Sequence, residues 1–292
     1  MTRLAPMIGA EITGIDLSCP LDAETVRNVA QALALYGILV FPDQAISDEA
    51  HARFGKQFGE LARFRASDSC DSAVPEIFRG ANTDQNGNLL APGDERLKLM
   101  KINWLWHIDS SYRAVPTRGA ILHGLEMIDD AGDTIFANLR AAYEMLPTAE
   151  RNHIEGLFAR HSFEFMVNTC GLPALTGEEA AAIPAVLHPL VRQHRDGRKS
   201  LYLSPPYMET IAGWDQPASL ALVQELTEWA AQDRFLYRHR WRRNDLIMWD
   251  NGWTMHKVTP FDIAGAKRIT HGVVLVGSET IEPVWTGKRQ ES

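Results

Sequence analysis

The 292-residue sequence has few cysteines, no excess of basic residues and no long apolar run. Its three cysteines, Cys19, Cys70 and Cys170, lie far apart without a CxxC pair, which argues against a disulfide framework or a zinc–thiolate site. The formal net charge is -8, so the chain offers no basic surface for nucleic acid or for an anionic membrane. The apolar runs are too short to span a bilayer, and no signal-peptide pattern opens the chain. We therefore expect a cytoplasmic protein that binds neither nucleic acid nor membrane.

The composition, 45% hydrophobic and 23% charged, is that of a globular protein. No internal repeat or long linker divides the chain, so we predict one domain over residues 1–292. Apolar residues at helical spacing predict helices at 21–36, 47–58 and 219–232. Apolar or alternating runs predict strands at 9–17, 38–41, 119–127, 133–137, 191–194, 200–203, 238–241, 246–249 and 269–276.

Turn-forming residues complete this pattern. The tetrapeptide 195–198 predicts a hairpin between two of the strands, and the segments 83–93 and 170–185 are predicted to be loops. The strands do not alternate with helices as βαβ units do. The pattern therefore indicates an α+β domain built on an antiparallel barrel or sandwich.

Two short segments carry residues of the kind that bind metals. His107 and Asp109 are two positions apart, and on a strand such residues face the same side. A third ligand, His256, follows the turn at Asn251-Gly252. Two histidines and one carboxylate leave open positions on an octahedral ion, as in Fe(II) oxygenases, whereas a zinc HExxH motif is absent. By spacing alone, a chance HxD pair and a structural histidine remain alternatives.

Several further motifs occur in an order that resembles the taurine dioxygenase / phenoxyacetate-herbicide (2,4-D) dioxygenase family of Fe(II)/2-oxoglutarate-dependent dioxygenases. The motifs are FGKQFG (54–59), WHIDSSY (106–112), GDTIF (132–136), LRAAY (139–143), HPLVRQ (188–193), YRHRWRRNDLIMWDNGWTMH (237–256) and KRI (267–269). The resemblance implies a double-stranded β-helix (jelly-roll) core with flanking helices, and Fe(II), 2-oxoglutarate and O2 as cofactor and cosubstrates.

The same resemblance implies roles for individual residues. It makes His107, Asp109 and His256 the metal ligands, with Thr134 and Arg268 as the contacts of 2-oxoglutarate. Arg268 suits the distal carboxylate because its guanidinium offers a planar fork of donors. Asn103 matches a family residue that lies near both cosubstrate and substrate.

The sequence departs from the family pattern at one informative position. Many members carry a second arginine four residues after the first, and Gly272 stands there in this chain. Glycine removes a cation and is expected to open space beside the metal. The missing charge could be supplied by His271, Lys101, Arg113 or Lys257, and the sequence does not choose between them.

The substrate pocket is less specified than the metal site. Residues 61–100 are expected to form a loop over it, and they contribute Arg79 and Lys98 as candidate partners of an anionic substrate. Tyr207 offers either an aromatic wall or a rigid turn after two prolines. For each charged candidate, a solvated surface position is the alternative.

Taken together, these features predict oxidation of a C–H bond in a small, anionic organic substrate, such as an aryloxyalkanoate or a sulfonate. Hydroxylation, with or without subsequent ether or C–heteroatom cleavage, would release succinate and CO2. A desaturase or hydroxylase of secondary metabolism and a non-catalytic metal- or ligand-binding β-barrel remain alternatives. A small molecule is the expected partner, and the resemblance allows a homo-oligomer.

Overall fold

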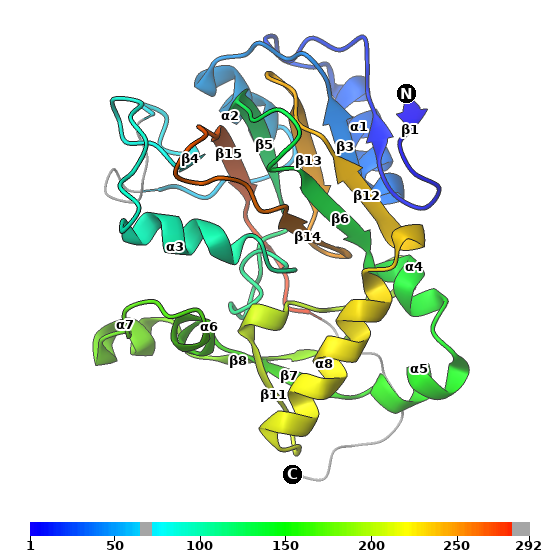
Figure 1. Cartoon of the computed structure of the whole chain (residues 1–292). Coiled ribbons are helices and arrows are strands. Elements are labelled where there is room, and N and C mark those ends of the chain that lie inside the picture. Colours follow the sequence, from blue (N-terminus) through cyan, green and yellow to red (C-terminus); the bar gives the residue numbers. More distant parts are fainter. Residues whose placement is uncertain (65–71, 282–292) are drawn as a thin grey trace.

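Two β-sheets face each other at the centre of the computed structural model, which describes residues 1–64 and 72–281 of the chain (Figure 1). Their facing side chains include Phe136 from one sheet and Val40, Ile247 and Trp249 from the other, all buried. The larger sheet has the strand order β1-β2-β3-β13-β5-β15-β4. Its strands are β1 (Thr2–Arg3), β2 (Ala10–Glu11), β3 (Ile38–Phe41), β4 (Phe78–Ala81), β5 (Gly119–Glu126), β13 (Leu246–Asp250) and β15 (Ile269–Leu275).

The outer face of the larger sheet is covered by two helices that the sequence predicts, α1 (Ala23–Tyr36) and α2 (Asp48–Lys56). The carboxylate of Asp22 caps α1 by accepting from two backbone N–H groups, and Gly37 ends it in the left-handed conformation at φ +72°. The buried stripes of both helices join one hydrophobic cluster with the outward side chains of the sheet. Helix formation here follows directly from periodicity and caps.

The smaller facing sheet has the order β12-β6-β14 and is antiparallel throughout. Its strands are β12 (Leu236–His239), β6 (Thr134–Asn138) and β14 (Thr254–Val258). The turn at Asn251-Gly252 joins β13 of the larger sheet to β14 of the smaller one. Consecutive strands therefore lie on opposite sides of the core, as in a sandwich.

A third layer lies below the two sheets in the view of Figure 1 and packs on its own hydrophobic cluster. It contains a sheet of order β11-β7-β8 and the hairpin β9-β10, whose turn is predicted from the sequence and has Gly197 at φ +80°. The elements are β7 (Phe158–His161), β8 (Val186–Pro189), β9 (Val191–Gln193), β10 (Lys199–Leu201), β11 (Met208–Ile211), η1 (Pro205–Tyr207), η2 (Asp233–Phe235), α4 (Leu139–Glu144), α5 (Thr148–Ile154), α6 (Phe163–Thr169), α7 (Gly177–Ala182) and α8 (Gln216–Ala230).

Three segments differ from the sequence-based expectation. The strand expected at 9–17 is reduced to β2, and the loop expected at 170–185 contains α7, which a Thr176–Glu179 capping box stabilises. The segment 61–100 is not one loop, because β4 pairs with β15 and α3 (Glu95–Ile102) follows. Short polar elements of this kind depend on tertiary pairing more than on local pattern.

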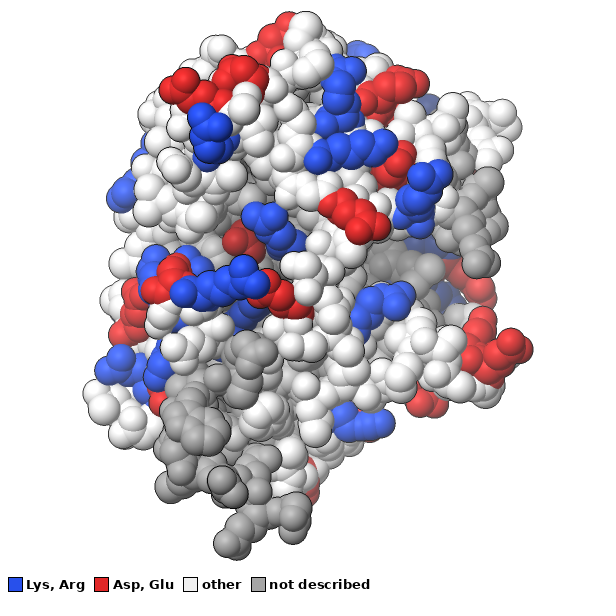
Figure 2. Space-filling view, turned by 180° about the vertical axis from the view of Figure 1, so that it is seen from behind, with Lys and Arg blue, Asp and Glu red and all other residues white. Residues whose placement is uncertain are grey.

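The surface and the helices bear on possible partners. Among the described residues, none of the helices combines the length and apolar character that crossing a bilayer would require. Figure 2 shows basic side chains interspersed with acidic ones over the back of the molecule, without a broad basic patch in the part of that face that the structure describes. Cys19 and Cys170 are free thiols, and Cys70 lies outside the described residues.

Candidate metal centre and cosubstrate site

His107 and Asp109 lie in an extended segment that follows α3, but this segment is not the strand that the i, i+2 spacing suggests. Only His107 pairs with another strand, through a single antiparallel bridge to His256 whose two N–H···O distances are both 2.9 Å. Asp109 lies in a turn, and Ser110 after it adopts a left-handed conformation at φ +57°. The turn, rather than a pleat, directs the carboxylate toward the imidazole.

His256 comes from β14, two positions after the strand begins. It pairs with Phe136 of β6, and its ring lies 5.6 Å from the ring of Phe136 and 5.0 Å from that of Trp249. Two sheet strands and an aromatic wall therefore fix the position of this imidazole.

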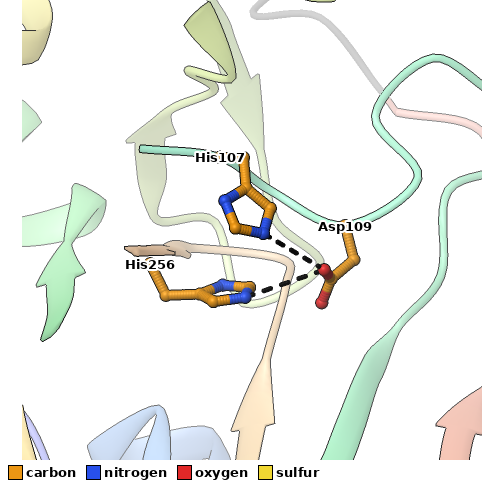
Figure 3. Close-up of side chains that lie close together, drawn as sticks. All are labelled: His107, Asp109 and His256. Atoms are coloured by element: carbon orange, nitrogen blue, oxygen red, sulfur yellow. Dashed lines mark ion pairs between the residues drawn. The ribbon is translucent and has the colours of Figure 1, made fainter. Parts of the chain in front are cut away.

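The three side chains converge on one point (Figure 3). Asp109 Oδ1 lies 3.6 Å from His107 Nε2 and 3.7 Å from His256 Nε2. The two imidazole rings are 4.3 Å apart. One ligand atom from each residue lies within 4.8 Å of the others, a spacing that a single ion can bridge.

Neighbouring groups orient the donor atoms. His107 Nδ1 lies 2.8 Å from the carbonyl oxygen of Leu105, so a proton on Nδ1 leaves Nε2 free for a metal. The indole of Trp249 donates to Asp109 Oδ2 at 3.2 Å and to Asn251 Oδ1 at 2.9 Å. Oδ1 of Asp109 is left facing the histidines.

Burial keeps the second histidine in its neutral, metal-binding form. Desolvation lowers the pKa of His256 to about 3, against a smaller opposing effect of Asp109. Two neutral imidazole nitrogens and one carboxylate oxygen on one side of a site form the facial donor set suited to non-haem Fe(II). The residues present therefore fit this metal.

Arg268 and Thr134 lie together at the end of the smaller sheet. Thr134 is the first residue of β6 and pairs with Val258, two residues beyond His256. Arg268 is 5% exposed, and its Nε donates to the carbonyl oxygen of Gly132 at 3.3 Å. The sheet register places Thr134 opposite the end of the strand that carries His256, and the contact with Gly132 places Arg268 close to the start of β6.

The guanidinium of Arg268 leaves a donor unused. Its buried Nη2 has no hydrogen-bond partner within the described ranges 1–64 and 72–281, and burial lowers the pKa of Arg268 to about 10. A buried guanidinium with a free donor is expected to receive an acceptor from elsewhere. The distal carboxylate of 2-oxoglutarate supplies such an acceptor, so the residues fit this cosubstrate as well.

The position of Gly272 differs from the expectation of open space. A Cβ atom there would lie 2.3 Å from Cζ of Phe78 and 3.0 Å from Cδ1 of Leu122. The ring of Phe78, which comes from the neighbouring strand β4, therefore fills the volume that a side chain at 272 would take. Gly272 makes room for this aromatic ring rather than for a ligand.

The other predicted residues separate into two groups. Arg79 is held by the loop after β4, because its guanidinium donates to Thr83 and to the carbonyl oxygen of Asp84. His271 lies 2.7 Å from Asp48 of α2, on the side of the larger sheet that faces the helices. Both side chains are therefore committed to contacts away from the metal centre.

Four predicted residues remain exposed. Lys98 and Lys101 lie on α3, Asn103 caps its C-terminal end, and Arg113 stacks on the ring of Tyr112 at 5.5 Å. Lys101 also stacks on an aromatic ring, that of Trp104, at 5.8 Å. The structure places Asn103 and Arg113 just before and just after the His107–Asp109 segment.

The sequence-based prediction missed an aromatic group beside the metal centre. The ring of Tyr112 lies 4.9 Å from that of the predicted Tyr207 and 4.8 Å from that of Phe163. Asp109 is among the groups that raise the pKa of both phenols, after the larger effect of burial. Tyr112 belongs to the WHIDSSY motif, so its proximity to the ligands could have been inferred, whereas Phe163 carries no such signal.

Comparison with known proteins agrees with this geometry. Residues 1–274 match the family model described as "Taurine catabolism dioxygenase TauD, TfdA family". The chain is 32% identical to the (S)-phenoxypropionate/alpha-ketoglutarate-dioxygenase of Sphingobium herbicidovorans over 92% of its own length and 93% of the relative's. It is 30% identical to the alpha-ketoglutarate-dependent 2,4-dichlorophenoxyacetate dioxygenase of Cupriavidus pinatubonensis, over 93% and 96%.

Solved structures extend this similarity to the fold. The crystal structure of AAD-2 in complex with Mn(II) and N-oxalylglycine has a TM-score of 0.86 and 33% identity, and the match covers 95% of this chain and 96% of that one. The facing sheets and flanking helices are therefore a jelly-roll core, as predicted.

Proposed function

The chain belongs to the taurine catabolism dioxygenase TauD, TfdA family, and we propose that its substrate is an aryloxyalkanoate-type acid, oxidised at a C–H bond. The enzyme is a 2-oxoglutarate-dependent dioxygenase that uses Fe(II) and O2. Bound together, Fe(II) and 2-oxoglutarate activate O2 to oxidise the substrate, while 2-oxoglutarate is converted to succinate and CO2.

The proposed roles of the binding residues follow from their geometry. His107, Asp109 and His256 hold the metal through Nε2, Oδ1 and Nε2. Arg268 offers its unpartnered Nη2 to the distal carboxylate of 2-oxoglutarate, and the adjacent Thr134 hydroxyl, which accepts from the indole of Trp241 at 2.9 Å, can donate its own proton.

The observation that carries the substrate proposal is the aromatic group of Tyr112, Phe163 and Tyr207. The ring of Tyr112 lies within 5 Å of each of the other two, and Phe163 and Tyr207 both pack against a cluster of apolar side chains from α3 and α6. Aromatic rings prefer to pack against other aromatic rings at such distances. A planar aryl group next to the metal centre would pack against these three rings better than the small aliphatic chain of taurine.

A cation next to the aromatic group of Tyr112, Phe163 and Tyr207 supports the proposal that the substrate carries an acidic group. Arg113 is exposed, stacks on Tyr112, and is joined to Ser110 by a backbone hydrogen bond of 2.9 Å in the turn after Asp109. Unlike Arg79 and His271, it has no partner among residues 1–64 and 72–281 that draws it away from the metal centre. We therefore assign Arg113, rather than those two, to the substrate carboxylate.

A substrate panel tests the proposal. The protein would be reconstituted with Fe(II) and 2-oxoglutarate, and succinate and phenol release would be measured with phenoxyacetate, both enantiomers of 2-phenoxypropionate, taurine and an alkyl sulfate. Hydroxylation of the carbon beside the ether oxygen gives a hemiacetal that collapses to phenol. We expect the aryloxy acids to stimulate succinate release at least about ten-fold more than taurine.

Other outcomes separate the alternatives. Preference for taurine or the alkyl sulfate would overturn the aryl assignment, and an unsaturated product would indicate a desaturase. If none of these acids stimulated succinate release, the proposed class of substrate would be wrong. A small molecule is the partner in each case.

We place the reaction in the cytoplasm, consistent with the free thiols Cys19 and Cys170, and propose that residues 1–292 act as one domain.

A further inference from the structure

A cleft of about 740 Å³ opens on the molecule at a place where none of the metal-binding residues lies. It lies beyond the end of β13 and against the β9-β10 hairpin, and the segment after β15 forms one wall. Its charged and aromatic lining residues include Arg118, Arg140, Arg192, Arg195, Asp250 and Tyr202. A concave site of this size is large enough for a small molecule.

Two of the arginines have buried donors for which the described part of the chain supplies no acceptor. The side chain of Arg192 forms no hydrogen bond or ion pair with the residues that the structure describes, and its Nε is buried. Arg140 is 6% exposed and its Nε is also unpartnered, while its Nη2 lies 3.4 Å from Asp196. The central carbon of its guanidinium lies over the ring of Trp253, 4.7 Å from the ring centre. Buried guanidinium donors without acceptors are costly unless a ligand or water completes them.

A third unsatisfied donor faces the same cleft. Tyr202 is 1% exposed, and its hydroxyl has no hydrogen-bond partner among the residues that the structure describes. The guanidinium of Arg192 lies 6.0 Å from the centre of the Tyr202 ring. The cleft therefore combines two guanidinium groups and one hydroxyl that all require acceptors.

The acidic residues at the cleft do not meet this requirement. Glu279 pairs with Arg195 at the rim. Asp196 accepts from the backbone N–H of Arg198 through Oδ1, and its Oδ2 lies 3.4 Å from Arg140. Asp250 accepts from the backbone N–H of Gly252 at 2.7 Å, and burial raises the pKa of its carboxyl group.

The pKa of a neighbouring histidine, His194, is consistent with a positive electrostatic field near Arg192 and Arg140. The pKa of His194 falls to about 3, chiefly through burial and then through the charges of Arg192 and Arg140. The acidic groups near these two arginines therefore leave the field at His194 positive, which favours an anion in the cleft.

We propose that this cleft binds a small dianionic oxyanion, held by Arg192 and Arg140 with the hydroxyl of Tyr202. Carboxylate and phosphate oxygens carry several acceptor sites each and match the planar fork of a guanidinium. The site is distinct from the cosubstrate site at Arg268, and it does not depend on the identity of the oxidised substrate.

The cleft also borders the groups that orient the metal carboxylate. Asn251 and Thr117 line it and are joined by a hydrogen bond of 3.1 Å. Asn251 in turn accepts from Trp249, which donates to Asp109. An anion in the cleft would therefore lie behind the metal centre, on the far side of Trp249.

Calorimetric titration tests the proposal on the full chain loaded with Mn(II) and saturated with 2-oxoglutarate, so that Arg268 is occupied. Inorganic phosphate and succinate are the two probes, and they distinguish phosphate from carboxylate ligands. We expect one saturable site for at least one probe. Arg192→Gln should weaken binding at least about ten-fold, since a charge-assisted contact is lost. Tyr202→Phe, which removes only the unpartnered hydroxyl, should weaken it about three-fold or more.

Two control variants locate the binding. Arg195→Gln changes an exposed arginine at the rim that already pairs with Glu279, and Arg268→Gln changes the cosubstrate site; both should leave probe affinity within about two-fold. If the melting temperature of Arg192→Gln shows that this variant folds poorly, the affinity of Tyr202→Phe becomes the test of the proposed site. Unchanged affinity in the deciding variant, loss of binding only in Arg268→Gln, or no saturable binding to the parent protein would overturn the proposal.

Discussion

At the scale of single residues, Trp249 joins the metal centre to the sandwich core. Its indole donates to Asp109 Oδ2 and to Asn251, and its ring lies beside those of Phe136 and His256. A neighbour that orients a ligating carboxylate contributes strongly to metal affinity even though it does not touch the metal. Trp249 is therefore a positioning residue.

Trp249→Phe keeps the ring packing and removes the indole donor. We expect Fe(II) or Mn(II) to bind about ten- to a hundred-fold more weakly, because Asp109 loses the contact that fixes its orientation. Titration of the metal-free protein measures this. Trp229→Phe is the matched control, since its indole donates to the carbonyl oxygen of Ala142 in a different cluster. Equal metal affinity in the two variants would show that the indole contact is dispensable.

Arg268→Lys tests the geometry of the cosubstrate site. Lysine keeps the positive charge but lacks the planar fork, so we expect the KM for 2-oxoglutarate to rise by about ten-fold or more. Steady-state kinetics at saturating substrate measure the change. The control is Arg238→Lys, whose half-exposed guanidinium pairs with Asp133 nearby. A KM that stays within about two-fold of the parent value in Arg268→Lys would exclude the proposed contact.

Gly272 and Phe78 form a packed pair. Gly272→Ala places a Cβ 2.3 Å from the Phe78 ring, so we expect the free energy of unfolding to fall by about 1–3 kcal/mol. A smaller residue at 78 should remove much of this loss, and a double-mutant cycle with Phe78→Leu by urea unfolding measures the coupling. Gly93→Ala, where nothing lies within 4 Å, is the control. Additive effects at 78 and 272 would contradict the packing account.

At the scale of elements, α2 is attached to the larger sheet through buried histidines. His51 of α2 is fully buried, and its Nε2 lies 3.2 Å from the carbonyl oxygen of Ile121 in β5. Its ring lies near that of His123, and the pair His271–Asp48 lies close by. Burial, with a further contribution from His123, lowers the pKa of His51 to about 3.

This depressed pKa makes α2 packing sensitive to acid. Between the folded value near 3 and the unfolded value of 6.5, the unfolded chain binds a proton that folded His51 does not, so stability falls as pH decreases below 6.5. At pH 5 the loss from this residue is at most about 2 kcal/mol relative to pH 7. Urea unfolding should show a smaller loss in His51→Gln, but not in the exposed control His153→Gln. Parallel pH profiles of the parent and His51→Gln would refute this linkage.

Local pattern predicts the long elements of this fold well, because α1, α2, α8 and the buried strands of the larger sheet carry their own periodicity and caps. It fails for β4, β7 and β11, which are four residues each and exist through their partners. The three residues of the candidate metal centre could be predicted because the order of the motifs compensates for a weak spacing signal. The geometry of these residues could not be predicted, because Asp109 lies in a turn that follows a single β-bridge rather than on a strand.

At the scale of the whole molecule, the metal centre joins segments far apart in the sequence. His107 follows α3, whereas His256 belongs to the smaller sheet, and one backbone bridge links them. Arg268, the proposed contact of the cosubstrate, precedes β15 of the larger sheet and donates to Gly132 in the segment before β6 of the smaller one. Ligands that bind here hold both sheets and the α3 segment together, and they bind only the folded chain.

Metal and cosubstrate should therefore stabilise the whole domain. A ligand at a hundred times its Kd contributes about 2.7 kcal/mol, which for a chain of 292 residues corresponds to a rise of about 4–5 °C in melting temperature. We expect this rise when Mn(II) and 2-oxoglutarate are added to metal-free protein. His256→Ala should lose the metal-dependent part, since one of three ligand atoms is gone, whereas His153→Ala, at an exposed position, should keep it. If His256→Ala gained as much as the parent protein, the stabilising metal would bind elsewhere, and the assignment of the triad would be wrong.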